Sequence, residues 1–199
     1  VAIAPYSTGV NVGTYATSVR GAITGGKAIT NAAWADGTAK TISGATKTSP
    51  VVITSTAHGL SNGNRIFIKN VSGMTQLNNN QYTVAGATAN TFQLSGVNGT
   101  SYNTYSSGGT VTKCLTSSCE VVVTAVGHGL SNGNTAYILN VGGMTQLNDL
   151  TYTVASATAD TYVLSGNVGT SYSAYTSGGD SYCTVAGCEY FRFQNSSGN

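Results

Sequence analysis

The chain has 199 residues and a formal net charge of +2, and only 7% of its residues are charged. This balance provides no basic stripe to follow a phosphate backbone, so we exclude nucleic acid as a partner. A chain of this length can form one large β domain or two to three small ones, and its 26 glycines and 12 tyrosines favour short strands joined by tight turns.

We expect residues 1–37 to be an extended N-terminal region with short strands. Val1–Ala4 is predicted to be a strand, Pro5–Thr8 a turn and Val10–Gly13 a second extended piece. The stretch that follows, as far as Trp34, is rich in Gly and Ala and has little hydrophobic pattern. We expect it to be a loop, or extended chain packed on something else, and its role stays open.

An internal repeat dominates the rest of the chain. Residues 49–109 and 119–179 align without a gap at a spacing of 70, and 38 of the 61 aligned positions are identical. Such a spacing exceeds the usual periods of solenoid repeats and indicates a small domain that occurs twice. Short alternating or β-branched runs predict five strands in the first copy, at residues 51–54, 66–69, 82–85, 91–94 and 110–113.

The repeat therefore predicts an all-β protein, with two tandem small β-barrel or sandwich modules joined by disulfide-bridged hairpins. We place the first module at residues 38–113 and the second at residues 114–182. Residues 183–199 are expected to form a further disulfide hairpin and a terminal strand. The order of strands within each module is not determined by the pattern.

The cysteines occur as two Cys-x4-Cys units, Cys114 with Cys119 and Cys183 with Cys188. Residues that face each other across a short turn lie about 4.5–5.5 Å apart at Cα, within reach of a disulfide. Zinc sites usually have tighter spacing and a second ligand pair nearby, so two hairpin disulfides are favoured over metal ligands or free thiols. Disulfides indicate an oxidising compartment, and we expect an extracellular or cell-surface location.

The join between the modules contains no Gly/Ser-rich linker. Because the last strand of the first module leads through the Cys114–Cys119 turn into the second module, we expect a fairly stiff rod.

The sequence offers few residues for catalysis. His58 and His128 hold the same position in separate copies, and we expect each imidazole to bond the loop backbone beside Gly59 or Gly129. The six carboxylates are scattered, and neither a nucleophile elbow nor a P-loop is present. We therefore expect no enzyme activity, no catalytic or metal-binding residue and no cofactor.

The motif Gly-Thr-Ser-Tyr-x-x-Tyr recurs in both copies and contains Tyr102, Tyr105, Tyr172 and Tyr175. These tyrosines are a candidate interaction surface for a glycan or a neighbouring subunit. The favoured alternative is that they cover one end of a small barrel.

The repeated segment begins Pro-Val-Val-Ile-Thr-Ser-Thr-Ala-His-Gly-Leu-Ser-Asn-Gly-Asn at Pro50. It resembles a bacterial and phage β-module labelled as similar to the first catalytic cysteine half-domain of ubiquitin-activating enzymes. The label refers to fold, and because the four cysteines lie in predicted hairpins, the resemblance implies no ubiquitin chemistry.

The flanking segments carry a second resemblance. Pro5–Gly13, Trp34–Asp36 and Cys183–Gly198 are similar to stretches of TadE/TadG-like Flp (tight adherence) pilus-assembly proteins, some of which carry these modules. In that family an N-terminal transmembrane segment anchors a part that lies outside the cytoplasmic membrane. This chain begins at Val1 without Met and has no run of about 18 apolar residues, so we expect a soluble interior stretch of a longer precursor. Membrane attachment would need an anchor absent from the chain.

These observations favour a structural protein of a bacterial surface or pilus-type assembly, self-assembling or adhesive, with protein partners. One alternative is a structural protein of a phage virion, in a tail or head fibre. Disulfides favour the first class, because virion proteins fold in a reducing cytosol. A second alternative is a carbohydrate-binding adhesin, which would have a glycan as its partner.

Overall fold

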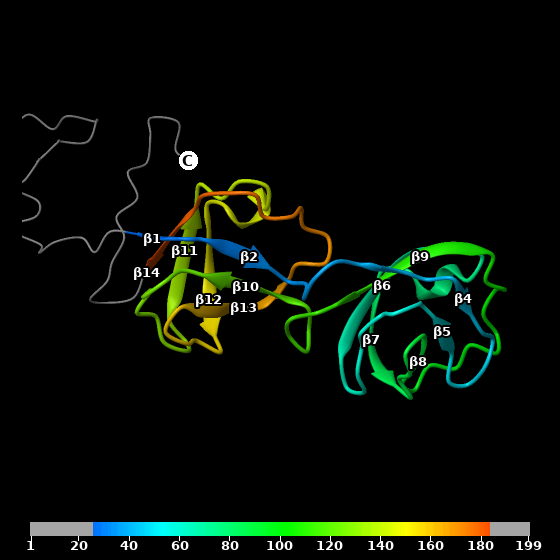
Figure 1. Ribbon diagram of the computed structural model, residues 1–199. Coiled ribbons are helices and arrows are strands. Elements are labelled where there is room, and N and C mark those ends of the chain that lie inside the picture. Colours follow the sequence, from blue (N-terminus) through cyan, green and yellow to red (C-terminus); the bar gives the residue numbers. More distant parts are fainter. Residues whose placement is uncertain (1–25, 184–199) are drawn as a thin grey trace, which may run out of the picture.

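The computed structural model describes residues 26–183. They form two antiparallel sheets, each curled into a small barrel, and the two barrels lie side by side (Figure 1). The predicted all-β class is confirmed. In the described part of the chain, no helix is long and apolar enough to cross a membrane.

Barrel 1 occupies residues 40–113, and its sheet order is β3-β9-β6-β7-β8-β5-β4. Its elements are β3 (Lys40–Thr41), β4 (Gly44–Ala45), β5 (Val52–Thr54), β6 (Arg65–Ser72), the 3-10 turn η1 (Thr75–Leu77), β7 (Asn80–Ala85), β8 (Thr91–Leu94) and β9 (Ser107–Lys113). The last five of these strands are the five predicted from the repeat. The short strands β3 and β4 were not predicted as two separate elements.

Barrel 2 has the same topology, with the order β1-β14-β11-β12-β13-β10-β2. Its elements are β1 (Lys27–Ala28), β2 (Asn31–Ala33), β10 (Glu120–Thr124), β11 (Thr135–Leu139), the 3-10 turn η2 (Thr145–Leu147), β12 (Leu150–Ala155), β13 (Thr161–Val168) and β14 (Asp180–Cys183).

Each barrel is closed by one kinked segment that pairs with both ends of its sheet. In barrel 1 this closing strand is residues 40–45, of which β3 pairs with β9 and β4 pairs with β5. At the kink, the Ile42 N–H donates to the Gly109 carbonyl at 2.9 Å, and the Ser43 N–H donates to the Thr54 carbonyl at 2.9 Å. Closure leaves no open sheet edge in the barrel.

The closing strand of barrel 2 is residues 27–33, where β1 pairs with β14 and β2 pairs with β10. Ile29 and Thr30 repeat the kink, with N–H donation to the Gly179 carbonyl at 2.8 Å and to the Thr124 carbonyl at 2.9 Å. Both kink isoleucines are buried, since Ile29 is 3% and Ile42 1% exposed.

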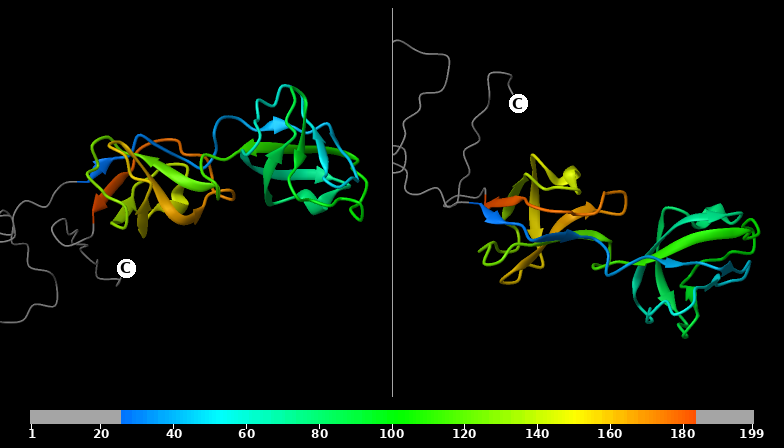
Figure 2. Two further views of the ribbon diagram at one scale, coloured as in Figure 1. Left: turned by 90° about the horizontal axis from the view of Figure 1, so that it is seen from below. Right: turned by 45° about the horizontal axis from the view of Figure 1, so that its top comes forward.

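The closing strands make the topology nested. The closing strand of barrel 2 comes first in the chain, all of barrel 1 follows, and then the other strands of barrel 2 (Figure 1). Two segments, residues 34–39 and 114–119, therefore connect the barrels (Figure 2). The stretch between residues 27 and 33, expected to be loop or chain packed on another part, adds two strands to the predicted second module. The predictions for Val1–Gly13 and for Cys188–Gly198 fall outside the described residues.

The core of each barrel consists of the side chains that point inward from its strands, at alternate positions along each strand. In β7, Tyr82 and Val84 are buried and Thr83 between them is not. Phe92 of barrel 1 and Tyr162 of barrel 2, which are 70 residues apart, are the largest fully buried side chains. Each core contains the inward side chains of all the long strands of its barrel.

Candidate functional site

The junction between the barrels contains two chain segments that pair with each other. Ala35 and Cys114 form an antiparallel bridge. The Asp36 N–H donates to the Lys113 carbonyl at 2.8 Å, and the Leu115 N–H donates to the Trp34 carbonyl at 2.9 Å. The Lys113 ammonium also contacts the Asp36 carboxylate at 2.6 Å. The connection is therefore double and hydrogen-bonded.

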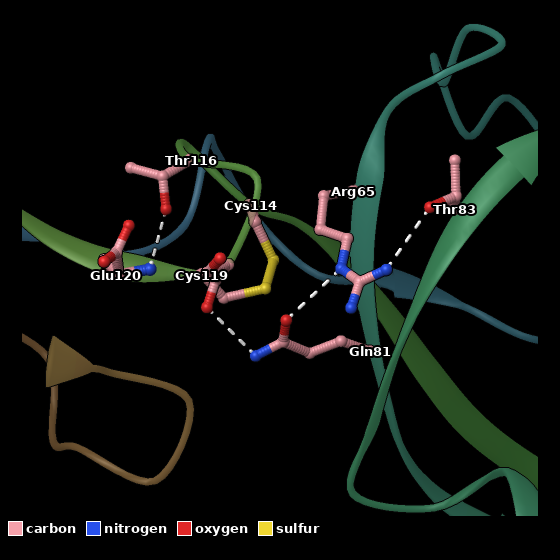
Figure 3. The surroundings of a disulfide bond; sticks show 8 residues. Arg65, Gln81, Thr83, Cys114, Thr116, Cys119 and Glu120 are labelled. Carbon is pink, nitrogen blue, oxygen red and sulfur yellow. Dashed lines mark hydrogen bonds between the residues drawn. A yellow bond between two sulfur atoms is a disulfide. The ribbon is translucent and has the colours of Figure 1, made fainter. Parts of the chain in front are cut away.

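The predicted Cys114–Cys119 disulfide is confirmed, with the two Cα atoms 4.9 Å apart (Figure 3). The strands on either side of it do not pair with each other, however. β9 already lies between β3 and β6, and β10 lies between β13 and β2. The expected hairpin is thus a bridged turn between two barrels, because both edges of each flanking strand are occupied within its own barrel.

The second predicted disulfide lies only partly within the described residues. Cys183 is disulfide-bonded. Cys188, its predicted partner, is outside them, and the described residues contain no free cysteine.

A small apolar cluster surrounds the bridge. Phe67 of β6 is buried together with Cys114 and Cys119, and Trp34 packs against all three. The Trp34 and Phe67 rings meet edge to face, with centroids 5.8 Å apart. Gly169 of barrel 2 closes the cluster, because a Cβ there would lie 2.8 Å from the Trp34 Cβ. This cluster joins both connecting segments to both barrels.

Polar contacts attach the bridged turn to each barrel (Figure 3). On the side of barrel 1, Arg65 Nε donates to Gln81 Oε1 at 3.2 Å, and Gln81 Nε2 donates to the Ser118 carbonyl at 3.0 Å. On the side of barrel 2, the Glu120 N–H donates to the Thr116 hydroxyl at 2.8 Å, and the Gly169 N–H donates to the Cys119 carbonyl at 3.0 Å. The turn is consequently held from both sides by hydrogen bonds.

Two shallow hollows adjoin the junction. One, of about 340 Å³, is lined by Gly63, Asn64, Arg65, Thr83 and residues 113–117. The other, of about 360 Å³, lies between the barrels and is lined by Phe67, Lys69, Asn79, Thr170, Ser171 and Tyr172. The second hollow has an aromatic ring, a cation, an amide and hydroxyls, a mixture that suits a polar ligand with an apolar face.

The four predicted tyrosines have structural contacts. Tyr105 donates its hydroxyl to the Ile42 carbonyl at 3.0 Å, and Tyr175 donates to the Ile29 carbonyl at 2.9 Å. Each of these tyrosines thus fastens the kink of one closing strand. Tyr102 and Tyr172 are half-buried and pack against the cores of their barrels. Of the four, Tyr172 lines the hollow between the barrels, and a role of the four in binding stays a prediction.

The predicted backbone role of the histidines is confirmed. His58 is 4% exposed, and its Nδ1 accepts the Leu60 N–H at 2.9 Å while Nε2 lies 3.3 Å from the Thr91 carbonyl. His128 has the same contacts with Leu130 and Thr161. An Nδ1 that accepts a backbone N–H carries no proton, so the neutral ring donates through Nε2. Among residues 26–183, no group of three or more His, Cys, Asp or Glu is placed to hold a metal ion.

Sequence reasoning predicted a strand at residues 38–43, in a hairpin with the strand that begins at Val51, but it missed the closing strand of barrel 2, although a signal for it exists. Lys27-Ala28-Ile29 and Lys40-Thr41-Ile42 share a Lys-x-Ile pattern at a spacing of 13. This spacing differs from the repeat of 70, because the two closing strands follow one another in the chain before the other strands of either barrel.

A comparison with known protein families covers most of barrel 1. Residues 49–114 match the family model described as the ubiquitin-activating enzyme E1 FCCH domain, which includes β5 to β9 but not the closing strand. A comparison with curated proteins found no match. Cys114, at the end of the matched range, is bonded to Cys119, so the match adds no reactive thiol.

Proposed function

We propose that the chain is an extracellular structural protein of a bacterial surface or pilus-type assembly, in which the two barrels act as a stiff spacer. The observation that carries the proposal is the junction, where two connecting segments, a disulfide and a shared apolar cluster restrain the barrels. A protein that only had to tether two binding domains would need no more than one flexible linker.

The disulfide supports the location in this proposal. A bridge that persists needs an oxidising compartment, such as a periplasm, a cell surface or the medium. The finer assignment, to TadE/TadG-like Flp pilus-assembly proteins, is based on the flanking segments Pro5–Gly13 and Cys183–Gly198 and stays a proposal.

Electron microscopy of the native material, with antibody against the barrels, tests the proposal. We expect label on cell-surface filaments or on the envelope, and particles with the outline of a phage virion would contradict it. Small-angle X-ray scattering of the purified chain tests the stiffness: two barrels that sample all orientations would be incompatible with a spacer.

A glycan-binding adhesin is a second candidate, favoured by the hollow between the barrels with Tyr172 and Lys69 in its lining. Tyrosine rings stack on the apolar faces of sugars, and hydroxyls and amides bond their hydroxyl groups. Glycan-array binding that is lost in Tyr172→Ala but kept in Tyr102→Ala, the equivalent position in barrel 1, would support it. Equal loss in both variants, or no binding by the native chain, would contradict it.

A further inference from the structure

Charge is divided between the barrels along the line of the junction. Barrel 1 contains five cationic side chains and no Asp or Glu, namely Lys40, Lys47, Arg65, Lys69 and Lys113. Barrel 2 contains four acidic side chains and one cationic side chain, namely Glu120, Asp149, Asp160, Asp180 and Lys27. The chain as a whole has a formal charge of only +2, so the overall value conceals two barrels of opposite sign.

The division results from substitutions at equivalent positions of the repeat. At the spacing of 70, neutral residues of barrel 1 become acidic, in the pairs Asn79 and Asp149, Asn90 and Asp160, and Thr110 and Asp180. Cationic residues become neutral, in the pairs Arg65 and Thr135, and Lys69 and Leu139. All of these changes lower the charge of barrel 2 relative to barrel 1.

Two of the acidic side chains have contacts inside barrel 2, since the Asp149 carboxylate accepts the Tyr137 hydroxyl at 2.9 Å and the Glu120 carboxylate accepts the Gly166 N–H at 2.7 Å. The fold does not require the charge of Asp160. The Asn90 side-chain oxygen accepts the Ala57 N–H at 3.0 Å, and the Asp160 carboxylate makes the equivalent contact to the Gly127 N–H at 3.0 Å. An amide and a carboxylate thus serve the turn equally well.

Charged side chains of both barrels face solvent in the described part of the chain. Among residues 26–183 the one salt bridge joins Lys113 to Asp36, which belongs to a connecting segment and not to barrel 2. Lys40 and Lys47 are exposed, and so is Asp160. Both barrels therefore present charged side chains of opposite sign to solvent.

We propose that copies of this chain associate with barrel 1 of one copy against barrel 2 of another, through these opposite charges. The partner is a second copy, because one molecule carries both complementary surfaces. Opposite fields over whole barrels speed association and disfavour contacts between like barrels. This inference rests on the proposed structural role and names the partner through which the protein would assemble.

Two variants test the pairing. The first reverses barrel 1 with Lys40→Glu, Lys47→Glu and Lys69→Glu. The second gives barrel 2 the residues of barrel 1, with Leu139→Lys, Asp160→Asn and Asp180→Thr, so that no foreign side chain enters the fold. Lys27→Glu is the matched control, because Lys27 is exposed and begins a closing strand as Lys40 does but lies in barrel 2.

Sedimentation velocity at low and high salt measures the association of the native chain and of each variant. We expect each triple variant to associate about tenfold more weakly at low salt, and Lys27→Glu to associate no more weakly than the native chain. A mixture of the two variants should recover complexes, since the unaltered barrel 1 of one faces the unaltered barrel 2 of the other. High salt should weaken the native association, because the Debye length falls to about 3 Å at 1 M.

Association that is equal in all variants and insensitive to salt would overturn the charge pairing and leave the structural role intact. A mixture that recovers no complexes would overturn it as well. A native chain that stays monomeric at low salt would overturn self-association altogether, whereas the location of the protein on filaments or virions is decided separately by electron microscopy.

Discussion

The two barrels share one fold but are completed in different ways. In barrel 1 the closing strand ends at Ala45 and the next strand begins at Val52, so the barrel is one continuous piece of chain. In barrel 2 the closing strand ends at Ala33 and the next strand begins at Glu120, with the whole of barrel 1 between them. Equivalent sequences therefore produce one barrel that closes locally and another that closes only over a long loop.

The largest expected effect concerns this difference in closure. A fragment of residues 38–119 contains every strand of barrel 1, and we expect it to fold cooperatively. A fragment of residues 114–183 lacks β1 and β2, which leaves β10 and β14 as open edges and uncovers the core. We expect it to remain unfolded or to aggregate, as measured by near-ultraviolet circular dichroism and thermal unfolding.

Restoring the missing strand provides the control. Residues 26–35 joined by a flexible linker to residue 114 should rescue the second fragment, because the pairing of β2 with β10 needs proximity and not barrel 1 itself. A fragment of residues 114–183 that folds as well as barrel 1 would show that the closing strand is dispensable.

These closing strands also mark the limit of what the sequence could predict. The long strands have clear alternation, as in Tyr82 and Val84, and the Cys114–Cys119 spacing predicted the disulfide correctly. Residues 27–33 bury little beyond Ile29 and Ala32, too few positions for a period. Their partners lie about 90 or more residues away, and pairing at such separation leaves no local pattern. The same nesting explains why the bridged turn was predicted as a hairpin.

The disulfide provides a second, smaller test of the comparison. Cys114→Ala with Cys119→Ala should lower the free energy of unfolding by about 2 kcal/mol, the chain-entropy value for so short a loop. We expect barrel 2 to lose more stability than barrel 1. The bridged turn lies in the long connection between the closing strand of barrel 2 and its other strands. Hydrogen exchange resolved along the chain measures both barrels in one sample.

Trp34→Ala serves as the companion variant, since it removes an aromatic side chain packed against the apolar cluster but keeps the disulfide. If the cysteine variant destabilises both barrels equally, the bridge acts on the whole chain and not on the closure of barrel 2.

The hydroxyls that hold the kinks should have a smaller effect. Tyr105→Phe removes the bond to the Ile42 carbonyl, and Tyr175→Phe removes the equivalent bond to Ile29. Each should cost about 1 kcal/mol, the usual net value of one hydrogen bond. The Tyr175 variant should also increase exchange at β1 and β2, whereas the Tyr105 variant should leave them unchanged. Increased exchange of both closing strands in either variant would contradict independent closure.

The last difference between the barrels concerns their stability at alkaline pH. It has no effect at neutral pH and is the most specific to barrel 2. Burial raises the pKa of Tyr82 in barrel 1 to about 12, and it does the same for Tyr152 in barrel 2. Barrel 2 has a further such group, because Tyr162 replaces Phe92, and burial raises the pKa of Tyr162 to about 12 although its bond to Ser181 opposes the shift. A raised pKa means that the folded state keeps a proton which the unfolded state, with a pKa near 10, has already released.

The stability that these hydroxyls contribute is therefore complete below about pH 10 and is lost as pH rises toward 12. Barrel 2 should lose stability more steeply than barrel 1, because it has two such tyrosines against one. Chemical unfolding over this pH range, followed with the ultraviolet absorbance of tyrosinate, measures the loss. Tyr162→Phe leaves barrel 2 with one tyrosine of raised pKa, as in barrel 1. This variant should make the slope of stability against pH equal in the two barrels. Slopes that stay different in that variant would place the alkaline sensitivity of barrel 2 in its long connection and not in its core.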